Sequence, residues 1–595
     1  RRVLFRSSAA SNIDVSLTKD GDPSHILEGY VNVPLGDRAA LRISAWDKDD
    51  GGYIDNVAGL RTLPLTNSRD ITLDNSDLVE ENFNELSKQG ARAALRVDLD
   101  DQWLVTLGLI AQKQETRGTW DHDPNDVDDL QIQRFHPDSS SDEFVQASLS
   151  LEGEVGEHAL TYAVSALNRD VEYEADYTEY SEVASWVPYY ACDYSSLAGS
   201  VNTDCISTAE HYTDDNTYKR QTHEIRLQSM GAERLNYVLG IFYDDSEHEY
   251  LQEFVQPGMT QAYWARAKDG IYYTTDQVRN EQQSAVFGEL SFALSEDFEA
   301  TLGVRRFWSE SRLSGFTGFG DSPWGLFGQF PVDASQKESD TIFKANVSWV
   351  IDDERLLYFT VSEGYRSGGL NRDPNAGGGS YVPDLLTNYE LGWKTTWQDG
   401  RLRLNGAAYF MDWQDMQFTV YDFAISTVGN TYNIGAAEIK GLEADVRYLI
   451  SPDWSVSASL SYNDGETTAG FIIPGLDAAT VEEGTRLPSV PRYKGNLVSR
   501  YEFNLGGFDA FTQLSYSYHG DAFSEIRPNS RILQEAYQLI NLRAGVEFER
   551  WGVDVYIHNA SDERADVSAG ARNSYEDSIT TNRPRVMGVK FKLRF

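Results

Sequence analysis

Hydrophobic and polar residues alternate with a period of two along most of the chain, and sustained helical periodicity is almost absent. The segment WLVTLGLIAQ (103–112) places Trp103, Val105 and Leu107 on one face of an extended strand. WSVSASLSYN (454–463) sets an apolar face bounded by aromatic residues against a face of small serines. Such segments predict β-strands in a barrel wall that has lipid on one side and a wet lumen on the other.

The connections between the predicted strands alternate between short and long. Ten short turns make ten hairpins, and a first strand near 12–18 and a last strand at 588–595 bring the total to about 22. Short turns at one end and long loops at the other are typical of an outer-membrane barrel, with periplasmic turns and extracellular loops. The sequence therefore predicts an all-β fold, a transmembrane antiparallel β-barrel of about 22 strands. The short turns are expected at 34–39, 99–102, 152–158, 229–235, 294–299, 351–356, 398–402, 451–454, 505–508 and 548–552, and the long polar stretches at 51–88, 113–142, 170–220, 246–283, 311–340 and 560–585.

The last strand, GVKFKLRF (588–595), has two different faces. Val589, Phe591, Leu593 and Phe595 alternate with three basic residues, so we expect the apolar set to face lipid and the basic set to face the lumen. A closed barrel has no free edge, so the partner of this strand is expected to be the first strand, near 12–18.

Composition narrows the class of protein further. Of the 595 residues, 41% are hydrophobic and mean hydropathy is -0.47, and no apolar run approaches the 18 residues that a transmembrane helix needs. With 51 basic and 93 acidic residues the net charge is -42, which argues against nucleic acid as a partner because phosphate contacts require clustered Lys and Arg. Aromatic residues make up 12% of the chain, too many for a disordered protein.

The sequence offers no catalytic constellation. Its histidines stand apart, without the spacing of a zinc protease motif, and no nucleophile elbow or phosphate-binding loop occurs. The one enzyme alternative is an outer-membrane hydrolase that uses His223 in QTHEIRLQS with a nearby serine. We therefore predict that the chain is not an enzyme.

The segment YTEYSEVASWVPYYACDYSSLAG (177–199) is the strongest candidate for binding a ligand. Its aromatic side chains suit stacking on sugars or catecholate rings, although they equally suit packing of the loop on its neighbours. The only two cysteines fit a local disulfide that would restrict this loop, and two separate thiols are the alternative. The residues concerned are Trp186, Tyr189, Tyr190 and Tyr194 for the ligand, and Cys192 and Cys205 for the disulfide.

A second candidate is the acidic segment DHDPNDVDD (121–129), whose oxygen atoms are suitable ligands for Ca²⁺. It lacks the glycine and the closing glutamate of an EF-hand, so a solvated acidic loop is the competing interpretation. The carboxylates of this possible structural calcium site are Asp121, Asp123, Asp126 and Asp128, and the sequence predicts no other cofactor.

Several segments together resemble the barrel of the TonB-dependent receptors of Gram-negative outer membranes. EGYVNVPLGDRAALRISAWDKDDGGYIDN (28–56) is similar to the entry into that barrel, and LYFTVSEGYRSGGLN (357–371) and NYELGWKTTWQDGRLRLNGAAYFMDWQDMQ (388–417) are similar to its central strands. INLRAGVEFERWGVDVYIHNASDE (540–563) and the terminal octapeptide resemble its last strands. The resemblance covers nearly the whole chain.

The resemblance implies uptake of a scarce solute, most often a ferric siderophore, bound as a small molecule or metal chelate at the extracellular side. It implies as partners the TonB complex of the inner membrane, outer-membrane lipid and the barrel-assembly machinery, for which Phe595 resembles the recognition signal. Cobalamin or carbohydrate uptake, a passive porin-like channel and a surface adhesion barrel are the alternatives.

The family places a plug domain before its barrel, whereas barrel-like sequence here starts within about thirty residues of Arg1. We therefore expect residues 1–11 to be a residual or non-native segment, residues 12–595 to be the barrel, and the plug to be absent from this fragment.

Overall fold

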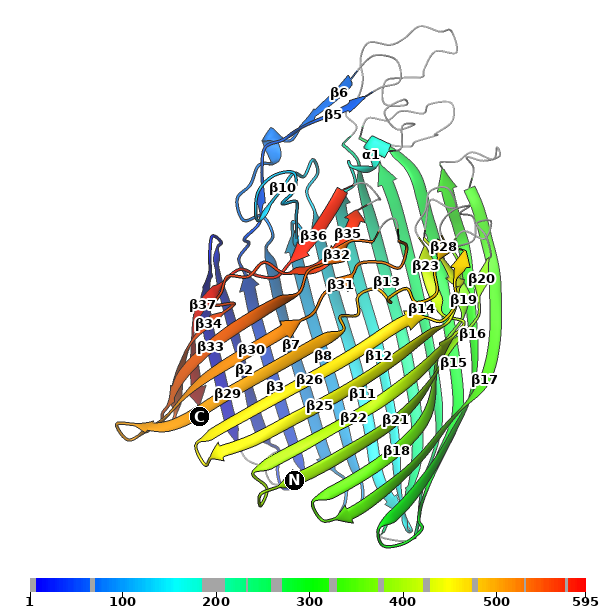
Figure 1. Ribbon diagram of the computed structural model, residues 1–595, viewed down its shortest axis with the longest axis vertical. Helices are drawn as coiled ribbons and strands as arrows, with labels where there is room; N and C mark the ends of the chain where they lie inside the picture. Colours follow the sequence, from blue (N-terminus) through cyan, green and yellow to red (C-terminus); the bar gives the residue numbers. More distant parts are fainter. Residues whose placement is uncertain are drawn as a thin grey trace.

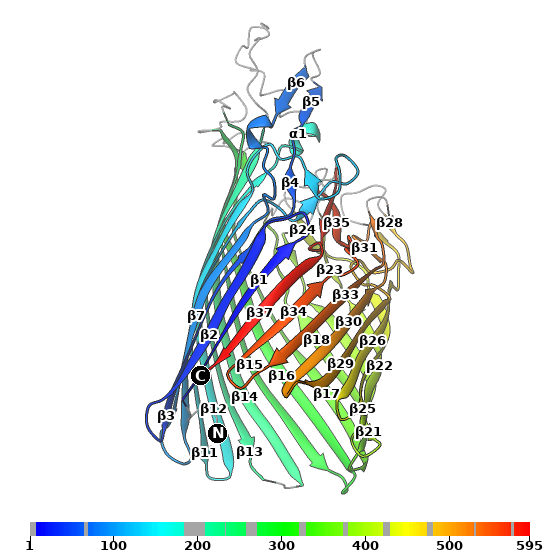
Figure 2. The same cartoon turned by 90° about the vertical axis from the view of Figure 1, so that its left-hand side faces the viewer.

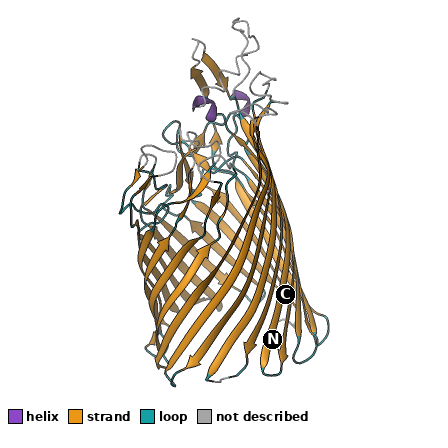
Figure 3. Cartoon of the chain, turned by 90° about the vertical axis from the view of Figure 1, so that its right-hand side faces the viewer, coloured by secondary structure: helices purple, strands orange, loops and turns teal. Residues whose placement is uncertain are grey.

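The structure is a computed structural model of the chain. It describes residues 7–64, 70–183, 209–231, 234–257, 270–319, 329–372, 379–420, 429–472, 480–528, 531–572 and 576–595. Nearly all regular structure in these residues is β, and the two short helices, η1 (Ser76–Leu78) and α1 (Tyr180–Val183), lie at the end of the molecule that carries the long connections (Figure 3). The all-β prediction is confirmed.

One antiparallel sheet of 22 strands forms the barrel, as the sequence predicted. Each strand pairs with its neighbours along the chain, and the last strand pairs with the first. The strands are β1 (Ser8–Thr18), β2 (Pro23–Pro34), β3 (Ala39–Asp50), β7 (Leu86–Asp98), β8 (Leu104–Arg117), β11 (Ser139–Val155), β12 (His158–Asp176), β13 (His211–Ser229), β14 (Leu235–Val255), β15 (Ile271–Ala293), β16 (Phe298–Phe319), β17 (Gln329–Asp352), β18 (Arg355–Arg366), β21 (Asp384–Trp397), β22 (Leu402–Gln414), β25 (Ala437–Ser451), β26 (Trp454–Thr467), β29 (Tyr493–Leu505), β30 (Phe508–His519), β33 (Tyr537–Glu547), β34 (Trp551–His558) and β37 (Val586–Arg594).

All ten predicted short turns join consecutive strands at one end of the barrel. The turn between β29 and β30 is only Gly506–Gly507, with φ of 63° and 99°. A two-residue turn with positive φ at both positions matches the twist of the flanking strands, and glycine adopts this conformation without strain. By the loop-length rule this is the periplasmic end.

The barrel closes between β1 and β37, which lie side by side in Figure 2. Ile13 is opposite Phe591, and the backbone amide of Phe595 donates a hydrogen bond of 2.9 Å to the carbonyl of Ala9. The predicted partner of the last strand is therefore confirmed. The first strand begins at Ser8 rather than near 12, because the alanines that follow Ser8 already pair with β2 and β37.

The two faces of the wall differ as the alternation predicted. Large apolar side chains such as Leu302 and Leu460 are 64% and 65% exposed on the outer face, whereas charged side chains face the lumen. On β37, Phe591 is 47% exposed while the Lys592 ammonium lies 2.7 Å from Glu547 on the lumen side. Within the described residues, no helix is long and apolar enough to cross a membrane.

Strands β13 to β17 are much longer than the sequence predicted. The stretches 246–283 and 311–340 were expected to be loops, yet β14 continues to Val255, β15 starts at Ile271, β16 continues to Phe319 and β17 starts at Gln329. A strand crosses the membrane in about 9–11 residues, and above that height both faces meet water, so the alternation disappears. These strands form the tall wall at the right of Figure 1.

The extracellular connections carry short sheets and buried apolar clusters among the described residues. Tyr53, Ile54, Phe83, Leu130 and Ile132 make one cluster above β3, β7 and β8. These connections therefore fold into a cap. Its strands are β4 (Asp55–Asn56), β5 (Leu60–Pro64), β6 (Asp70–Asp74), β9 (Asp121–His122), β10 (Gln131–Ile132), β19 (Gly369–Leu370), β20 (Ser380–Tyr381), β23 (Gln417–Val420), β24 (Asn430–Asn433), β27 (Phe471–Ile472), β28 (Thr480–Val481), β31 (Ala522–Phe523), β32 (Leu533–Gln534), β35 (Asp566–Arg572) and β36 (Glu576–Thr581).

Candidate functional site

The lumen side of the tall wall carries guanidinium groups among aromatic rings. Arg305 on β16 follows Val304, which is 46% exposed on the outer face, so alternation turns Arg305 into the lumen. Its guanidinium lies 5.1 Å from the ring centroid of Phe242 and 5.7 Å from that of Phe287, within the range of cation–π attraction. Its Nη2 donates a hydrogen bond of 3.3 Å to Oε1 of Gln283.

A stacked aromatic pair lies beside this arginine. The rings of Phe307 and Tyr365 are parallel within 1°, with centroids 3.7 Å apart, and Phe307 is fully buried. Gln283 donates from Nε2 to the Tyr365 hydroxyl at 2.9 Å and accepts from Arg305 with its carbonyl oxygen. Gln283 thus fixes the Arg305 guanidinium and the Tyr365 ring relative to each other. This lowers the conformational entropy that is lost when a planar ligand binds.

The connection between β18 and β21 folds inward onto the same wall. Leu370 is 4% exposed and packs with Tyr250, Leu313 and Val332 of β14, β16 and β17. Arg279 of β15 donates from Nη2 to the Leu370 carbonyl at 2.9 Å. This connection is therefore held against the lumen wall by both apolar packing and hydrogen bonds.

Arg372 in this connection is a second cation on the same wall, beside Tyr250, eight residues along β14 from the Phe242 that contacts Arg305. Its guanidinium lies 4.5 Å from the ring centroid of Tyr250, and its Nη1 donates to Oε1 of Gln252 at 2.9 Å. The carbonyl of Arg372 accepts a hydrogen bond of 3.1 Å from Gln277. Contacts with two strands, β14 and β15, thus fix the position of this cation.

The charges of this cluster are not compensated locally. Within the part of the chain that the structure describes, no carboxylate oxygen lies within 4.0 Å of the guanidinium of Arg305 or Arg372, and the only one near Arg279 belongs to Glu281, at 3.9 Å. Both unpaired guanidiniums are half-buried in a chain whose net charge is -42. Chemically, each of the two cations suits an anionic ligand with flat or aromatic groups, because guanidinium binds carboxylate and phenolate oxygens and stacks on rings.

The ligand and disulfide residues predicted from the sequence lie outside the described residues. Trp186, Tyr189, Tyr190, Tyr194, Cys192 and Cys205 all fall within 184–208, so the aromatic platform and the disulfide stay predictions. The described start of this segment packs onto the wall: the Tyr177 ring centroid lies 5.1 Å from that of Tyr180 and 5.0 Å from that of Phe254.

The acidic segment 121–129 lies in the connection between β8 and β11. Asp121 accepts a hydrogen bond of 2.6 Å from Thr580, and Asp129 lies 3.1 Å from Arg564. Among the described residues, Asp121, Asp123, Asp126 and Asp128 do not bring three carboxylates within 4.8 Å of one another. The calcium site stays a prediction, and in this geometry it requires the loop to rearrange.

His223, the residue of the hydrolase alternative, shares the outer face of β13 with Ile225, which is 46% exposed. Its Nδ1 lies 3.0 Å from the Tyr162 hydroxyl, and its ring also approaches Tyr243. Among the described residues, the contacts of His223 are with aromatic side chains, whereas the hydrolase alternative requires a hydrogen bond to a serine hydroxyl.

The cap contains a buried acid that the sequence did not indicate. Glu210 is fully buried between α1 and β15 and accepts hydrogen bonds of 2.7 Å from both the Ser181 and the Tyr272 hydroxyls. Burial raises the pKa of Glu210 to about 8, because the charged form loses its hydration. At neutral pH its carboxyl group is therefore mostly protonated.

Sequence reasoning missed the arginine cluster for two different reasons. For Arg305 a signal exists, since GVRRFWSE places it opposite Val304 and Trp308. For Arg372 there is no local signal, because its partner Gln252 is 120 positions away in the sequence.

Comparison with known proteins agrees with the architecture. The family model described as TonB dependent receptor-like, beta-barrel, matches residues 35–573. The pesticin receptor of Yersinia pestis is 21% identical over 622 aligned positions, covering 100% of this chain and 79% of that receptor.

Two solved structures share the fold. The ferric yersiniabactin uptake receptor FyuA from Yersinia pestis superposes with a TM-score of 0.76 at 17% identity, over 99% of this chain and 80% of that one. The siderophore receptor PiuA from Acinetobacter baumannii gives 0.72 at 13% identity, over 99% and 82%. Taken with the family match over residues 35–573, this shows that the chain belongs to the TonB-dependent receptor β-barrel family of Gram-negative outer membranes.

Proposed function

We propose that the chain is the barrel of an active uptake receptor for a ferric siderophore, and that the ligand is anionic and carries aromatic groups. The observation that carries this proposal is the pair of half-buried guanidiniums, Arg305 and Arg372, which lack a carboxylate partner in the described structure. Unpaired buried charge is costly, so such cations are expected where a ligand supplies the counter-charge.

The names of the similar proteins support the same ligand class. The pesticin receptor, the ferric yersiniabactin receptor and the siderophore receptor PiuA resemble this chain over most of its length in sequence or fold. A neutral oligosaccharide would leave both guanidiniums without a counter-charge, so carbohydrate uptake is the weaker candidate. Family membership supports energy transfer through TonB rather than passive diffusion, and a binding role rather than an enzymatic one.

The first test is direct binding to the folded chain in detergent. Ferric complexes of catecholate, phenolate and citrate ligands are compared with cobalamin and a neutral oligosaccharide by fluorescence quenching or calorimetry. One of the ferric complexes is expected to bind much more tightly than the neutral compounds, because only an anion compensates the two guanidiniums. Saturating binding of the oligosaccharide alone would contradict the proposal.

Substitution of the arginines makes the test specific. Arg305→Ala and Arg372→Ala are each expected to weaken binding by roughly 10- to 100-fold, since a hydrogen bond to a charged group contributes about 1.5–3 kcal/mol. Arg306→Ala is the matched control, because Arg306 is the next residue on β16 but lies on the other face, 5.7 Å from the Trp308 ring. Equal losses in Arg305→Ala and Arg306→Ala would show that general charge, and not this site, sets the affinity.

A further inference from the structure

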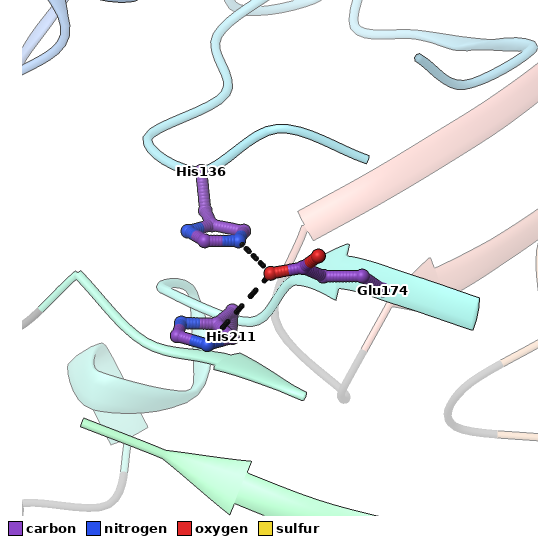
Figure 4. A group of neighbouring side chains, drawn as sticks. All are labelled: His136, Glu174 and His211. Carbon is purple, nitrogen blue, oxygen red and sulfur yellow. Dashed lines mark hydrogen bonds and ion pairs between the residues drawn. The ribbon is translucent and has the colours of Figure 1, made fainter. Parts of the chain in front are cut away.

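Two histidines and a glutamate meet at the extracellular rim, outside the lumen. His136 lies at the end of the connection between β8 and β11, Glu174 near the end of β12, and His211 at the start of β13 (Figure 4). His136 Nε2 is 2.7 Å from Glu174 Oε1, and His211 Nε2 is 3.9 Å from the same oxygen. One ligand atom from each residue lies within 4.8 Å of the other two.

The two imidazoles are held face to face rather than by hydrogen bonds. Their ring centroids are 3.9 Å apart and their planes differ by 6°. The Nδ1 of His211 is buried without a hydrogen-bond partner, and its Nε2 is too far from Glu174 for a hydrogen bond. A largely buried imidazole with neither nitrogen satisfied by a described residue carries a free energy cost, which coordination of an ion through Nε2 would reduce.

The backbone on both sides of His136 is fixed. The amide of Phe135 donates to Asp176 Oδ2 at 2.6 Å, and the Arg134 side chain, 2% exposed, lies 3.1 Å from Asp138 and 3.3 Å from Glu179. Asp138 in turn accepts a hydrogen bond from the amide of Asp176. His136 is therefore positioned against the ends of β12 and β13 before any ligand binds, as a metal site requires.

The position of the site separates it from the lumen. His211 and Ile225 are an even number of residues apart on β13, and β13 pairs with β12 without a register shift. Their side chains therefore lie on the same face, which is the outer face because Ile225 is exposed there. The 14 intervening steps place the histidine roughly 45 Å further along the strand than this lipid-facing residue. The site thus lies above the membrane on the outer side of the wall.

An acidic cavity gives access to the site. Glu174 and Thr213 line one end of a cavity of about 800 Å³ that runs along the outer rim. Carboxylates predominate among its charged groups, which attracts cations. The charged residues of its lining are Asp22, Asp49, Asp50, Glu85, Glu115, Arg117, Glu172, Glu174 and Asp215, with His25 at the far end.

We infer that His136, Glu174 and His211 form a binding site for a divalent transition-metal ion of the Zn²⁺ type. Two imidazoles and one carboxylate suit Zn²⁺ rather than Ca²⁺, which prefers oxygen ligands. A tetrahedral ion with bonds of about 2.0–2.1 Å needs its ligand atoms about 3.3 Å apart, compared with the present separations of 2.7 and 3.9 Å. An imidazole nitrogen coordinates in the plane of its ring, so binding also requires the two stacked rings to tilt until both planes point at the ion. The three residues leave a fourth position open for water, and the ion fastens the 118–138 connection to the barrel wall. The inference does not depend on the nature of the transported ligand.

The test is Zn²⁺ binding to the folded chain in detergent, after removal of metal with a chelator and blocking of the thiols. We expect one ion per chain by calorimetry, and a Co²⁺-substituted form with the visible absorption of a four- or five-coordinate site. His136→Ala and His211→Ala should each weaken Zn²⁺ binding by more than about 10- to 100-fold, the loss caused by removing an outer-shell partner alone. Glu174→Gln should weaken it as well, while keeping the size of the side chain.

His25→Ala is the control, because His25 forms a second, more exposed group with Asp47 and Asp49. It should leave the Zn²⁺ affinity unchanged. The inference is overturned if the unsubstituted chain binds no Zn²⁺, if binding is lost in His25→Ala instead, or if both His136→Ala and His211→Ala bind normally. Heat-dependent gel mobility shows in each case whether the variant is a folded barrel.

Discussion

Lumen-facing cations of this barrel differ in their partners, as a comparison of the closing wall (β33, β34 and β37) with Arg305 and Arg372 of the tall wall shows. In the closing wall, Arg543 bonds Asp554 and Lys592 lies 2.8 Å from the same carboxylate and 2.7 Å from Glu547. In the tall wall, Arg305 and Arg372 have aromatic and amide neighbours but no carboxylate partner among the described residues. Paired cations stabilise the closure, whereas under the proposed function the two unpaired cations receive their counter-charge from the ligand.

Strand length accompanies this difference. β33, β34 and β37 have 11, 8 and 9 residues, close to the 9–11 that cross a membrane, whereas β15, β16 and β17 have 23, 22 and 24 (Figure 1). The closing wall therefore ends near the membrane surface. The extra length of the tall wall extends it above the membrane, to the level of Tyr250 and Arg372.

The largest expected effect comes from breaking the pairing in the closing wall. Asp554 is fully buried between Arg543 and Lys592, so Asp554→Ala should lower the free energy of unfolding by about 3–5 kcal/mol, the cost of leaving buried charge uncompensated. Denaturant unfolding of the refolded barrel in lipid vesicles measures this change. Glu289→Ala is the control in the tall wall, where Glu289 and Lys344 form an exposed pair 2.8 Å apart, and it should cost less than about 1 kcal/mol. Equal destabilisation by the two substitutions would remove the distinction between the walls.

A smaller effect is expected from the end of the closing strand. Phe595 is 79% exposed, and its described hydrogen bonds are backbone bonds to Ala9. If the assembly machinery recognises this residue, deleting it should lower the amount of barrel in the outer membrane several-fold, while the molecules that fold keep their ligand affinity. Quantifying folded barrel in isolated membranes tests this. Phe508→Ala, at another exposed periplasmic phenylalanine, is the control, and normal assembly without Phe595 would refute the assignment.

The sequence predicted the closing wall well and the tall wall poorly, for a physical reason. Inside the membrane each strand meets lipid on one face and water on the other, so GVKFKLRF shows its faces directly. Above the membrane both faces meet water, so EHEYLQEF (247–254) looks like a loop although it belongs to β14. Sequence alone therefore located the strands that close the barrel and missed the upper halves of those that carry Arg305 and its neighbours.

The two candidate sites depend on contacts that register and loop folding create. His136, Glu174 and His211 are separated by 38 and 37 positions, and they meet because β12 pairs with β13 while the preceding connection returns to the same rim. Once the strands and their register are known, Glu174 is opposite Thr213. His211 is two residues from Thr213 on the same face of β13, so its side chain is expected close to Glu174. The position of His136 depends on the buried Arg134 network, for which the sequence carries no pattern.

A third effect concerns the cap of the tall wall and its dependence on pH. Burial raises the pKa of Glu210 from the ordinary 4.5 to about 8. Between these two pH values Glu210 is protonated in the folded cap but ionised in the unfolded segment, so folding takes up a proton. The contribution of Glu210 to cap stability is therefore fully present below about pH 4.5 and is lost as the pH rises towards 8, by at most about 1.4 kcal/mol per pH unit. Glu210→Gln, which stays neutral, should remove this part of the slope.

Hydrogen exchange of the amides around 176–183 at pH 5, 6 and 7, corrected for the intrinsic exchange rate, measures the slope in both proteins. The unsubstituted cap should open more easily as the pH rises. Burial also raises the pKa of Asp138, to about 6, but Asp138 is present in both proteins, so the difference between them measures the contribution of Glu210 alone. Glu249→Gln, at an exposed carboxylate paired with Lys219, should keep the original slope. Two results would show that the Glu210 carboxyl group is ionised in the folded protein: a cap that becomes more stable with rising pH, or the same dependence of cap stability on pH in Glu210→Gln. The tall wall would then contain a buried carboxylate with no cation beside it. Unpaired charges in this wall would therefore include an anion as well as the two arginines.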